Sequence, residues 1–274
     1  MTASSQARNT ASRAADSKPL EYLARGGFVA YGVIHLIFAW IALQLAFGSG
    51  SGGNNDQSGA FQELAQQPLG KTLVIITIVG MIGLAIWQAL EAAIGESGEQ
   101  NKTALAERFI SGCRTVMYLY FAFLGIKVLS GANASSGDSS QQGASTLMDN
   151  SGGRFLVGFI GVVVVGVGIG LAIYGFKKKF EKHLNTQQMD AKVRKTVERL
   201  GRAGYMAKGI AYAIAGVLVV VAAVNYDPEK ARGLDSALKT VATAPYGPWM
   251  LGLIALGIAA FGVYCFFQAR YRKV

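Results

Sequence analysis

Six long apolar stretches alternate with polar segments along the chain, and their lengths predict membrane-spanning helices. A helix needs about 20 apolar residues to cross a hydrocarbon core of about 30 Å. Lipid offers no partners for free backbone groups, so helices are expected there and open sheets are excluded. The predicted spans are Gly27–Phe47, Leu69–Ile94, Phe109–Leu129, Phe155–Phe176, Gly204–Val224 and Pro248–Phe267.

The six stretches form three copies of one two-helix unit. An arginine precedes the first helix of each unit, and a glycine 45 residues later opens the second helix. A constant spacing of this kind indicates a repeat architecture. Each unit is an out-and-back hairpin, so we expect an all-α, six-helix bundle with pseudo-threefold symmetry about the membrane normal. The anchor pairs are Arg25 with Gly70, Arg108 with Gly153, and Arg202 with Gly247.

The units divide the chain into five segments. Residues 1–17 are rich in Ala, Ser, Thr and Arg and are expected to be a disordered tail. The repeats are expected at 18–95, 101–180 and 193–274, joined by a linker at 181–192 that lies either in the membrane interface or in solvent as a helix. Each repeat is expected to start with a short amphipathic segment in the interface, namely Pro19–Arg25, Thr103–Arg108 and Val193–Arg202.

The segments between the two helices of each repeat have two kinds of pattern. Residues 48–55 and 131–137 are rich in Gly, Ser, Asn and Ala and predict flexible, solvated loops. Residues 60–65 and 237–242 predict short interfacial helices instead. The inward anchors of these segments are expected to be Leu64, Leu147 and Val241.

The fourth apolar stretch is unusually rich in glycine. Gly166 and Gly170 form a small-xxx-small pair, which allows helix backbones to approach closely in lipid. Close packing is the favoured interpretation, and a glycine hinge for gating is the alternative.

Composition and charge support the membrane assignment. Hydrophobic residues make up 51% of the chain and charged residues 15%. The net charge of +10 comes from Lys and Arg concentrated in the N-terminal segment, the even-numbered loops and the C-terminal segment. The positive-inside bias then places both termini in the cytoplasm. The expected partner is the lipid bilayer, with its anionic headgroups, and not nucleic acid.

The starts of the first and third units carry a resemblance to a known family. Residues 201–212 read Gly-Arg-Ala-Gly-Tyr-Met-Ala-Lys-Gly-Ile-Ala-Tyr, and residues 24–32 are a looser copy. This start resembles the bacterial membrane family called domain of unknown function 1206, whose members have three tandem two-helix repeats. The resemblance runs from about Leu20 to Lys273 and is weakest in the second unit, where Ile110 and Ser111 replace a Gly-aromatic pair. It implies this architecture and a bacterial inner membrane, and it implies no activity.

Three equivalent polar positions lie about ten residues inside the odd helices. Polar groups within membrane segments are costly and suggest function. If the repeats surround an axis, these positions form a polar layer on it; the alternative is a hydrogen-bonded packing layer. The residues of this axial layer are His35, Tyr118 and Tyr212.

A second set of basic positions is expected to form a collar near the cytoplasmic helix ends. Long cationic side chains can reach the headgroups from such positions. The functional alternative is a site for an anion or a lipid phosphate, since Arg contacts phosphate with two hydrogen bonds. Glu91 is the candidate acidic partner of this collar. Its basic members are Arg25, Arg108, Arg202, Arg114 and Lys208.

Signatures of enzymes and metal sites are missing from the sequence. It contains no His-Glu-x-x-His motif, no phosphate-binding glycine loop followed by Lys-Ser/Thr, and two histidines in total. Cys113 and Cys265 lie in predicted helices and are expected to be buried thiols. We therefore expect no enzymatic activity, no cofactor and no metal.

Two functions remain open from the sequence. The first is a non-enzymatic structural or lipid-associated membrane module, suggested by the repeats, the glycine packing and the basic collar. The second is a small transporter or channel with a path along the axis, past the polar layer. Transporter sites are often marked by helix pairs interrupted by Gly or Pro, and that pattern is missing here.

Overall fold

The computed structural model describes residues 18–47, 55–94, 102–131 and 135–273, and the predicted disordered tail at 1–17 lies outside them. Among the described residues, six helices are long and apolar enough to cross a membrane, and each of them contains one predicted span to within one residue. The protein is therefore an all-α, multi-pass membrane protein. The six helices are α2 (Lys18–Ala46), α4 (Gly70–Ile94), α5 (Lys102–Leu129), α7 (Ser151–Phe176), α8 (Ala191–Asn225) and α10 (Gly247–Tyr271).

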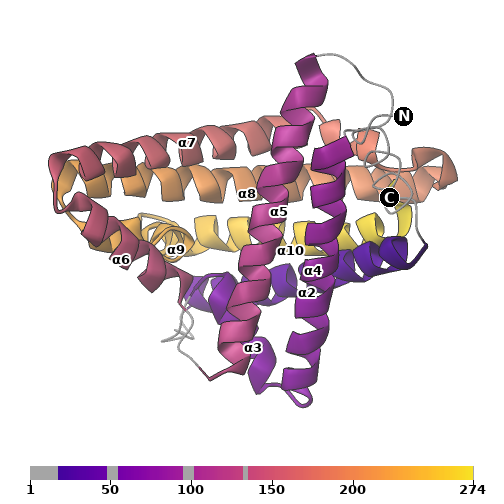
Figure 1. Ribbon diagram of the computed structural model, residues 1–274, viewed down its shortest axis with the longest axis horizontal. Helices are drawn as coiled ribbons and strands as arrows, with labels where there is room; N and C mark the ends of the chain where they lie inside the picture. Colours follow the sequence, from indigo (N-terminus) through magenta and orange to yellow (C-terminus); the bar gives the residue numbers. More distant parts are fainter. Residues whose placement is uncertain (1–17, 48–54, 95–101, 132–134, 274) are drawn as a thin grey trace, which may run out of the picture.

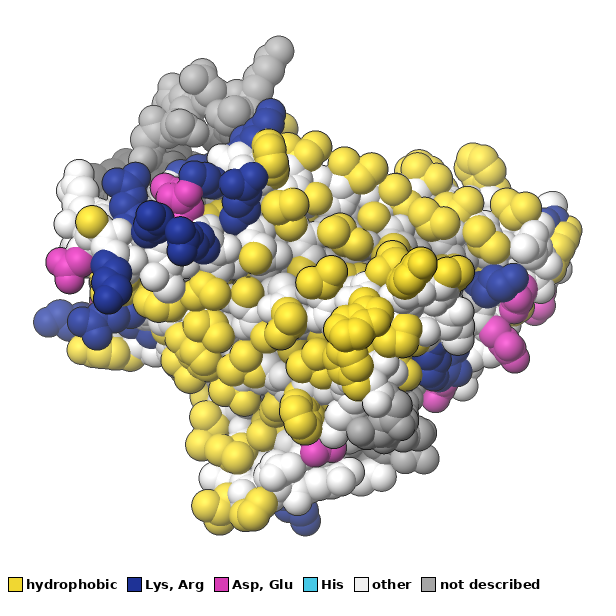
Figure 2. Space-filling model, turned by 180° about the vertical axis from the view of Figure 1, so that it is seen from behind, with side chains coloured by type: hydrophobic (Ala, Val, Ile, Leu, Met, Phe, Trp, Pro, Cys, Tyr) yellow, Lys and Arg dark blue, Asp and Glu magenta, His cyan; other side chains and the backbone are white. Residues whose placement is uncertain are grey.

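The sequence predicted that each repeat starts with a short, separate amphipathic segment, and in the described part of the chain these segments are not separate. They continue into the membrane helices, so α8 runs unbroken for 35 residues. A continuous helix satisfies its backbone groups internally, and a break at the interface would leave some without partners. Figure 2 shows the outcome on one face: hydrophobic side chains cover its middle, and Lys and Arg gather toward one end. We call that end, which includes Arg25, Arg108 and Arg202, the basic end.

Three short α-helices of the described chain lie at the opposite end, which we call the loop end: α3 (Gln57–Gln66), α6 (Ser136–Met148) and α9 (Leu234–Thr243). The first and third confirm the predicted short helices. The second begins inside a stretch expected to be a flexible loop, because Ser135 caps it by accepting from the Asp138 backbone N–H. The other predicted loop residues, 48–54 and 132–134, lie outside the described part. Leu64 and Val241 are buried anchors as expected, whereas Leu147 is exposed.

Two buried carboxylates hold the loop end together. Asp56 caps α3 and also accepts from Ser136 and from the Gly137 backbone N–H at 3.1 Å, which joins α3 to α6. Asp235 of α9 accepts from the Asn55 backbone N–H at 3.1 Å and from Arg232 at 3.1 Å. The short helices of all three repeats are thereby linked by charge-assisted hydrogen bonds.

The long helices follow the spatial order α5, α4, α2, α10, α8, α7, in which each packs on its neighbour. A closed pseudo-threefold ring would also pack α5 along α7, and the described residues of these two helices have no extensive contact. In Figure 1, α6 extends between the ends of α5 and α7, and α4 and α5 run steeply across the other helices. The tandem hairpins are present, but the pseudo-threefold symmetry is not confirmed.

The linker between the second and third repeats does not form the predicted helix before α8 begins at Ala191. It consists of two 3-10 turns, η1 (Lys179–His183) and η2 (Thr186–Gln188). Phe180 and Leu184 are buried, and Leu184 pairs with Arg272 in an isolated antiparallel bridge. The two apolar side chains explain why the segment folds against the helices.

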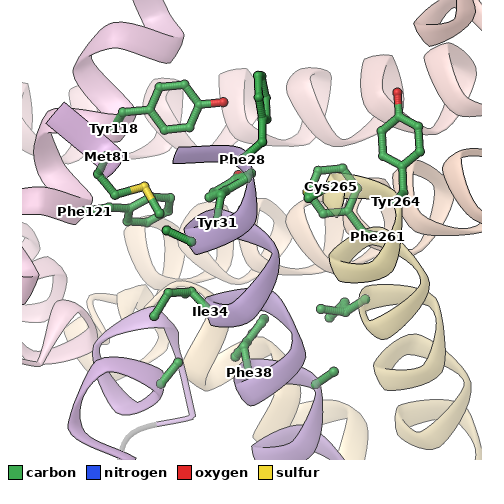
Figure 3. Close-up of a cluster of buried hydrophobic side chains, with 14 of the residues drawn as sticks. Phe28, Tyr31, Ile34, Phe38, Met81, Tyr118, Phe121, Phe261, Tyr264 and Cys265 are labelled. Atoms are coloured by element: carbon green, nitrogen blue, oxygen red, sulfur yellow. The ribbon is translucent and has the colours of Figure 1, made fainter. Parts of the chain in front are cut away.

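Aromatic side chains fill the interior near the basic end. Figure 3 shows Tyr31 between Tyr118 and Phe261, and their ring centroids lie 5.4 Å and 6.0 Å from that of Tyr31. Cys265 is buried among them as predicted, whereas Cys113 is exposed on α5. The prediction for Cys113 was wrong because α5 packs mainly on α4 and α3, and 33% of its most apolar window is buried.

The glycines that pack α7 on α8 are not the predicted pair. A Cβ atom added at Gly166 or Gly170 would meet no atom within 4 Å. One added at Gly168 would lie 2.5 Å from the Ala213 backbone N, and one at Gly209 of α8 would lie 2.6 Å from the Ala172 backbone N. The contact face of α7 comprises Gly161, Gly168 and Gly175, one residue in every seven.

This difference predicts opposite outcomes for one substitution at two nearby positions. Gly168→Ala should lower the free energy of unfolding by about 1–3 kcal/mol, because the added methyl overpacks a backbone contact. Gly166→Ala should leave it unchanged or slightly raised, since alanine favours helix. Denaturant unfolding in detergent micelles measures both. Equal effects of the two substitutions would contradict the assignment of the packing face.

Candidate functional site

Two of the predicted collar arginines are occupied as helix caps. Arg25 donates from Nη1 to the carbonyls of Ala269 and Arg270, both at 2.7 Å, at the end of α10. Arg108 donates to the carbonyls of Ala92 and Ala93 at 2.8 Å and 2.5 Å, at the end of α4. The last carbonyls of a helix lack partners within it, and a cation there also complements the helix dipole.

Arg202 has a different environment from the other two anchor arginines. Its Cζ atom lies 4.7 Å from the ring centroid of Phe176, at the end of α7. Within the described part of the chain, neither Arg202 nor Arg199 makes a hydrogen bond or an ion pair. Both line the head of a groove of about 630 Å³ between α8 and α10.

The rest of this groove is apolar. Its floor is formed by two small residues, Ala207 and Gly257, which lie so close that a Cβ atom added on Gly257 would be 2.3 Å from that of Ala207. The small side chains at the floor create the hollow, and larger apolar side chains form its walls. The apolar lining comprises Ala203, Met206, Ala207, Ile210, Leu253, Ile254, Leu256 and Gly257.

Arg114 and Lys208, the other two collar candidates, point into the protein. Arg114 reaches Gln88 Oε1 at 3.5 Å. Glu91, the candidate collar partner, accepts from Gln88 and from Ser111 at 3.4 Å. Within the described residues, neither Arg25 nor Arg108 donates a hydrogen bond to Glu91. The Glu91 carboxylate therefore belongs with Gln88 and Ser111 and not with the collar.

Lys208 joins the collar set to the polar layer. Its Nζ lies 3.0 Å from the Tyr31 hydroxyl and 3.2 Å from Nε2 of His35, and 3.9 Å from the ring centroid of Phe261. His35 Nδ1 lies 2.8 Å from the Tyr31 carbonyl oxygen, which can only accept. Nδ1 therefore carries the proton of a neutral imidazole, and Nε2 accepts from the ammonium.

The three residues of the predicted axial layer gather around this ammonium and Tyr31. The rings of His35 and Tyr118 contact the ring of Tyr31 at centroid distances of 4.2 Å and 5.4 Å. Tyr212 lines a cavity together with His35 and Lys208, and its volume is about 10 Å³. That space is at the lower limit for one water molecule. A proton can be shared between Lys208 Nζ and His35 Nε2. The small volume of the cavity shows that the surrounding side chains are packed like those of a protein core.

Three polar side chains that the sequence analysis did not single out lie near the basic end. Arg272 and Tyr264 are buried, at 5% and 0% exposure, and His183 lines a cavity with Arg114 and Glu91. Arg272 stacks on Phe28 and Trp87. Nothing in the pattern separates Arg272 from its exposed neighbour Arg270, since both belong to one basic run. Within the described segments, no group of three His, Cys, Asp or Glu residues could hold a metal ion.

Because the Lys208 ammonium is buried, we expect a second substitution to restore stability that a first one removes. His35→Phe should lower the free energy of unfolding by about 1–3 kcal/mol, because Lys208 loses an acceptor. Adding Lys208→Met should restore part of that loss, since the charge is removed with its partner. A double-mutant cycle by denaturant unfolding in micelles measures the coupling. Additive losses would contradict a contact between the two side chains.

Comparisons with known proteins agree with the repeat structure. The family model described as Domain of Unknown Function (DUF1206) matches three times, at residues 26–95, 111–178 and 203–272. The chain is 27% identical over 261 residues to "Uncharacterized protein YxxB" of Bacillus subtilis (strain 168), an alignment covering 94% of each chain. No solved structure matches it. The three matches coincide with the three hairpins and cover most of the sequence, so the chain belongs to the family Domain of Unknown Function (DUF1206).

Proposed function

We propose that this protein is a non-enzymatic, lipid-associated membrane protein that binds an anionic phospholipid in the groove between α8 and α10. The observation that carries the proposal is the shape and chemistry of that groove. Two guanidinium groups without ion pairs in the described structure, those of Arg199 and Arg202, lie at its head, and an apolar trough follows. A phospholipid has a matching arrangement, because its charged phosphate is followed by hydrocarbon chains.

Electrostatics supports an anionic headgroup over a neutral one. Guanidinium donates two parallel hydrogen bonds to phosphate oxygens, and anionic lipids also attract nearby cations through the surface potential. Partners already occupy Arg25 and Arg108, which leaves the third anchor arginine, Arg202, for such a ligand. The proposed site is thus local to the third repeat and does not encircle the protein.

The proposed lipid lies in the cytoplasmic leaflet of a bacterial inner membrane. The excess of Lys and Arg at the basic end supports this orientation through the positive-inside rule, with both termini in the cytoplasm. That leaflet carries the negative surface potential with which the groove is complementary.

Native mass spectrometry with phosphatidylglycerol tests the proposed lipid site. Arg199→Ala/Arg202→Ala should reduce retained lipid several-fold, since both headgroup contacts are removed. Ala203→Leu should reduce it as well without altering charge, because the side chain fills the trough.

The matched control is Lys192→Ala/Lys195→Ala, which removes two exposed charges from the same helix outside the groove. Retention in this control should equal that of the unaltered protein. An equal loss in both double variants would indicate a general basic surface and would count against a defined site.

A path along the helix bundle is the second candidate function. The buried polar group of Lys208, His35 and Tyr31 favours it, because polar residues inside membrane segments often mark ion or proton pathways. The cavity of about 10 Å³ at these residues favours a packed interior instead.

Aqueous thiol labelling separates the two candidates. Cysteine at positions 35 and 118, in a background lacking Cys113 and Cys265, should not react with a small water-soluble reagent, because both positions are buried. A cysteine at exposed Ser140 serves as the reactive control. Labelling at both buried positions would establish water in the bundle and favour transport over the lipid-associated module.

A further inference from the structure

A cluster of buried and half-buried polar residues near the basic end, two of them arginines, is not explained by the proposed lipid groove. We call it the inner cluster, and it consists of Arg114, His183, Tyr264 and Arg272. These residues come from α5, from the linker turn η1, from α10 and from the segment that follows α10. The groove between α8 and α10 has none of them in its lining.

Backbone pairing turns Arg272 into the protein. The Asn185 N–H donates to the Tyr271 carbonyl at 2.7 Å, and the Lys273 N–H donates to the His183 carbonyl at 3.0 Å. Residues alternate sides along such an extended pairing. Arg272 is therefore 5% exposed, while Lys273, the residue that follows it, is exposed.

The guanidinium of Arg272 has no anionic partner in the described structure. Its Cζ lies 4.8 Å from the ring centroid of Trp87 and 5.1 Å from that of Phe28, and its buried Nε has no hydrogen-bond partner there. Aromatic faces offset part of the cost of burying a cation. They do not replace an acceptor, so a buried donor and a buried charge remain without compensation.

Tyr264 adds a second unpartnered polar atom. Its side chain is fully buried, and its hydroxyl has no hydrogen-bond partner in the described part of the chain. Figure 3 shows the hydroxyls of Tyr264 and Tyr118 on the same side of the apolar cluster, away from Ile34 and Phe38. Buried polar groups are nearly always paired, so two orphans close to one helix end need an explanation.

Two members of the cluster, Arg114 and His183, line a cavity of about 70 Å³ together with Glu91, Ser111 and Tyr174. Burial, together with the positive charges of Arg272 and Arg114, lowers the pKa of His183 to about 3. The imidazole is thus neutral at physiological pH and shares its surroundings with two guanidinium groups. Lys182 and Glu107, which also line the cavity, form an ion pair with each other.

We propose that the inner cluster binds one small oxyanion of the phosphate class. Arg272 and Arg114 act as its counter-ions, and the Tyr264 hydroxyl donates a hydrogen bond to it. Guanidinium groups match the geometry of oxyanions and bind them with paired hydrogen bonds. The phosphate comes either from solution or from a lipid headgroup, since both present the same chemistry.

Thermal unfolding of the full chain in phosphate-free detergent buffer tests this site. Added inorganic phosphate should raise the unfolding temperature in a saturable way, and sodium chloride at equal ionic strength should not. Tyr264→Phe should weaken the apparent phosphate affinity about tenfold, which corresponds to one hydrogen bond to a charged group. Arg272→Gln should weaken it further, and Arg270→Gln, at an exposed arginine of α10, should leave it unchanged.

Tyr264→Phe keeps the test valid if Arg272→Gln fails to fold, because it removes an oxygen that has no partner within the described structure. A response to phosphatidylglycerol alone, lost in the same variants, would support the site with a lipid phosphate as its source. No response to either ligand, or a response that Tyr264→Phe and Arg272→Gln both retain, would overturn the proposal. Loss of lipid binding in the Arg199/Arg202 variant with phosphate binding intact would separate the two sites.

Discussion

Carbonyl groups at the ends of membrane helices need hydrogen-bond donors, and at the basic end arginines of a different repeat provide them. Arg25 of the first repeat caps α10 of the third, and Arg108 of the second caps α4 of the first. Arg202 of the third lies against Phe176 at the end of α7 of the second. The anchor arginine of each repeat thus contacts the last helix of the repeat before it. For the first repeat, the contacted helix is that of the third, so the series of contacts is cyclic.

This cyclic pairing explains which helices pack most closely. The pairs α2 with α10, α4 with α5, and α7 with α8 are equivalent contacts between repeats, and each begins near an anchor arginine. Within repeats the packing is uneven: α2 packs on α4 and α8 on α10, whereas the described residues of α5 and α7 have no extensive contact. In α7, 17% of the most apolar window is buried, compared with 56% in α2 and α4. The membrane helices of the second repeat are therefore the least covered by other helices, with 33% of the window in α5 buried.

The sequence predicted the features that depend on composition and period. Hydrophobic length located the six spans, and the spacing of Arg and Gly located the repeats. The faces of the helices were harder to predict. Gly166 and Gly170 have the spacing of a packing motif, yet Gly161, Gly168 and Gly175 make the contact, and both sets lie in one glycine-rich helix. Only the position of α8 distinguishes them.

The sequence singled out several polar residues that the structure brings together, and it did not predict how they group. His35, Tyr118 and Tyr212 do lie near one another, and Lys208, assigned to the collar, completes their contacts. A side chain of Lys or Arg is long enough to point to the surface or to the interior from one backbone position. Arg272 and His183 come together through a backbone pairing between the linker and the residues after α10, which no local pattern encodes.

That pairing has a consequence for how the protein is made. Leu184 is synthesised before α8 and α10, and Arg272 follows them, so the bridge between the two forms only after both helices of the third repeat have entered the membrane. Until then Phe180 and Leu184 lack the neighbours that bury them. The bridge therefore marks completion: a chain in which this segment is protected from proteases has finished inserting its last hairpin, and a chain in which it is cleaved has not.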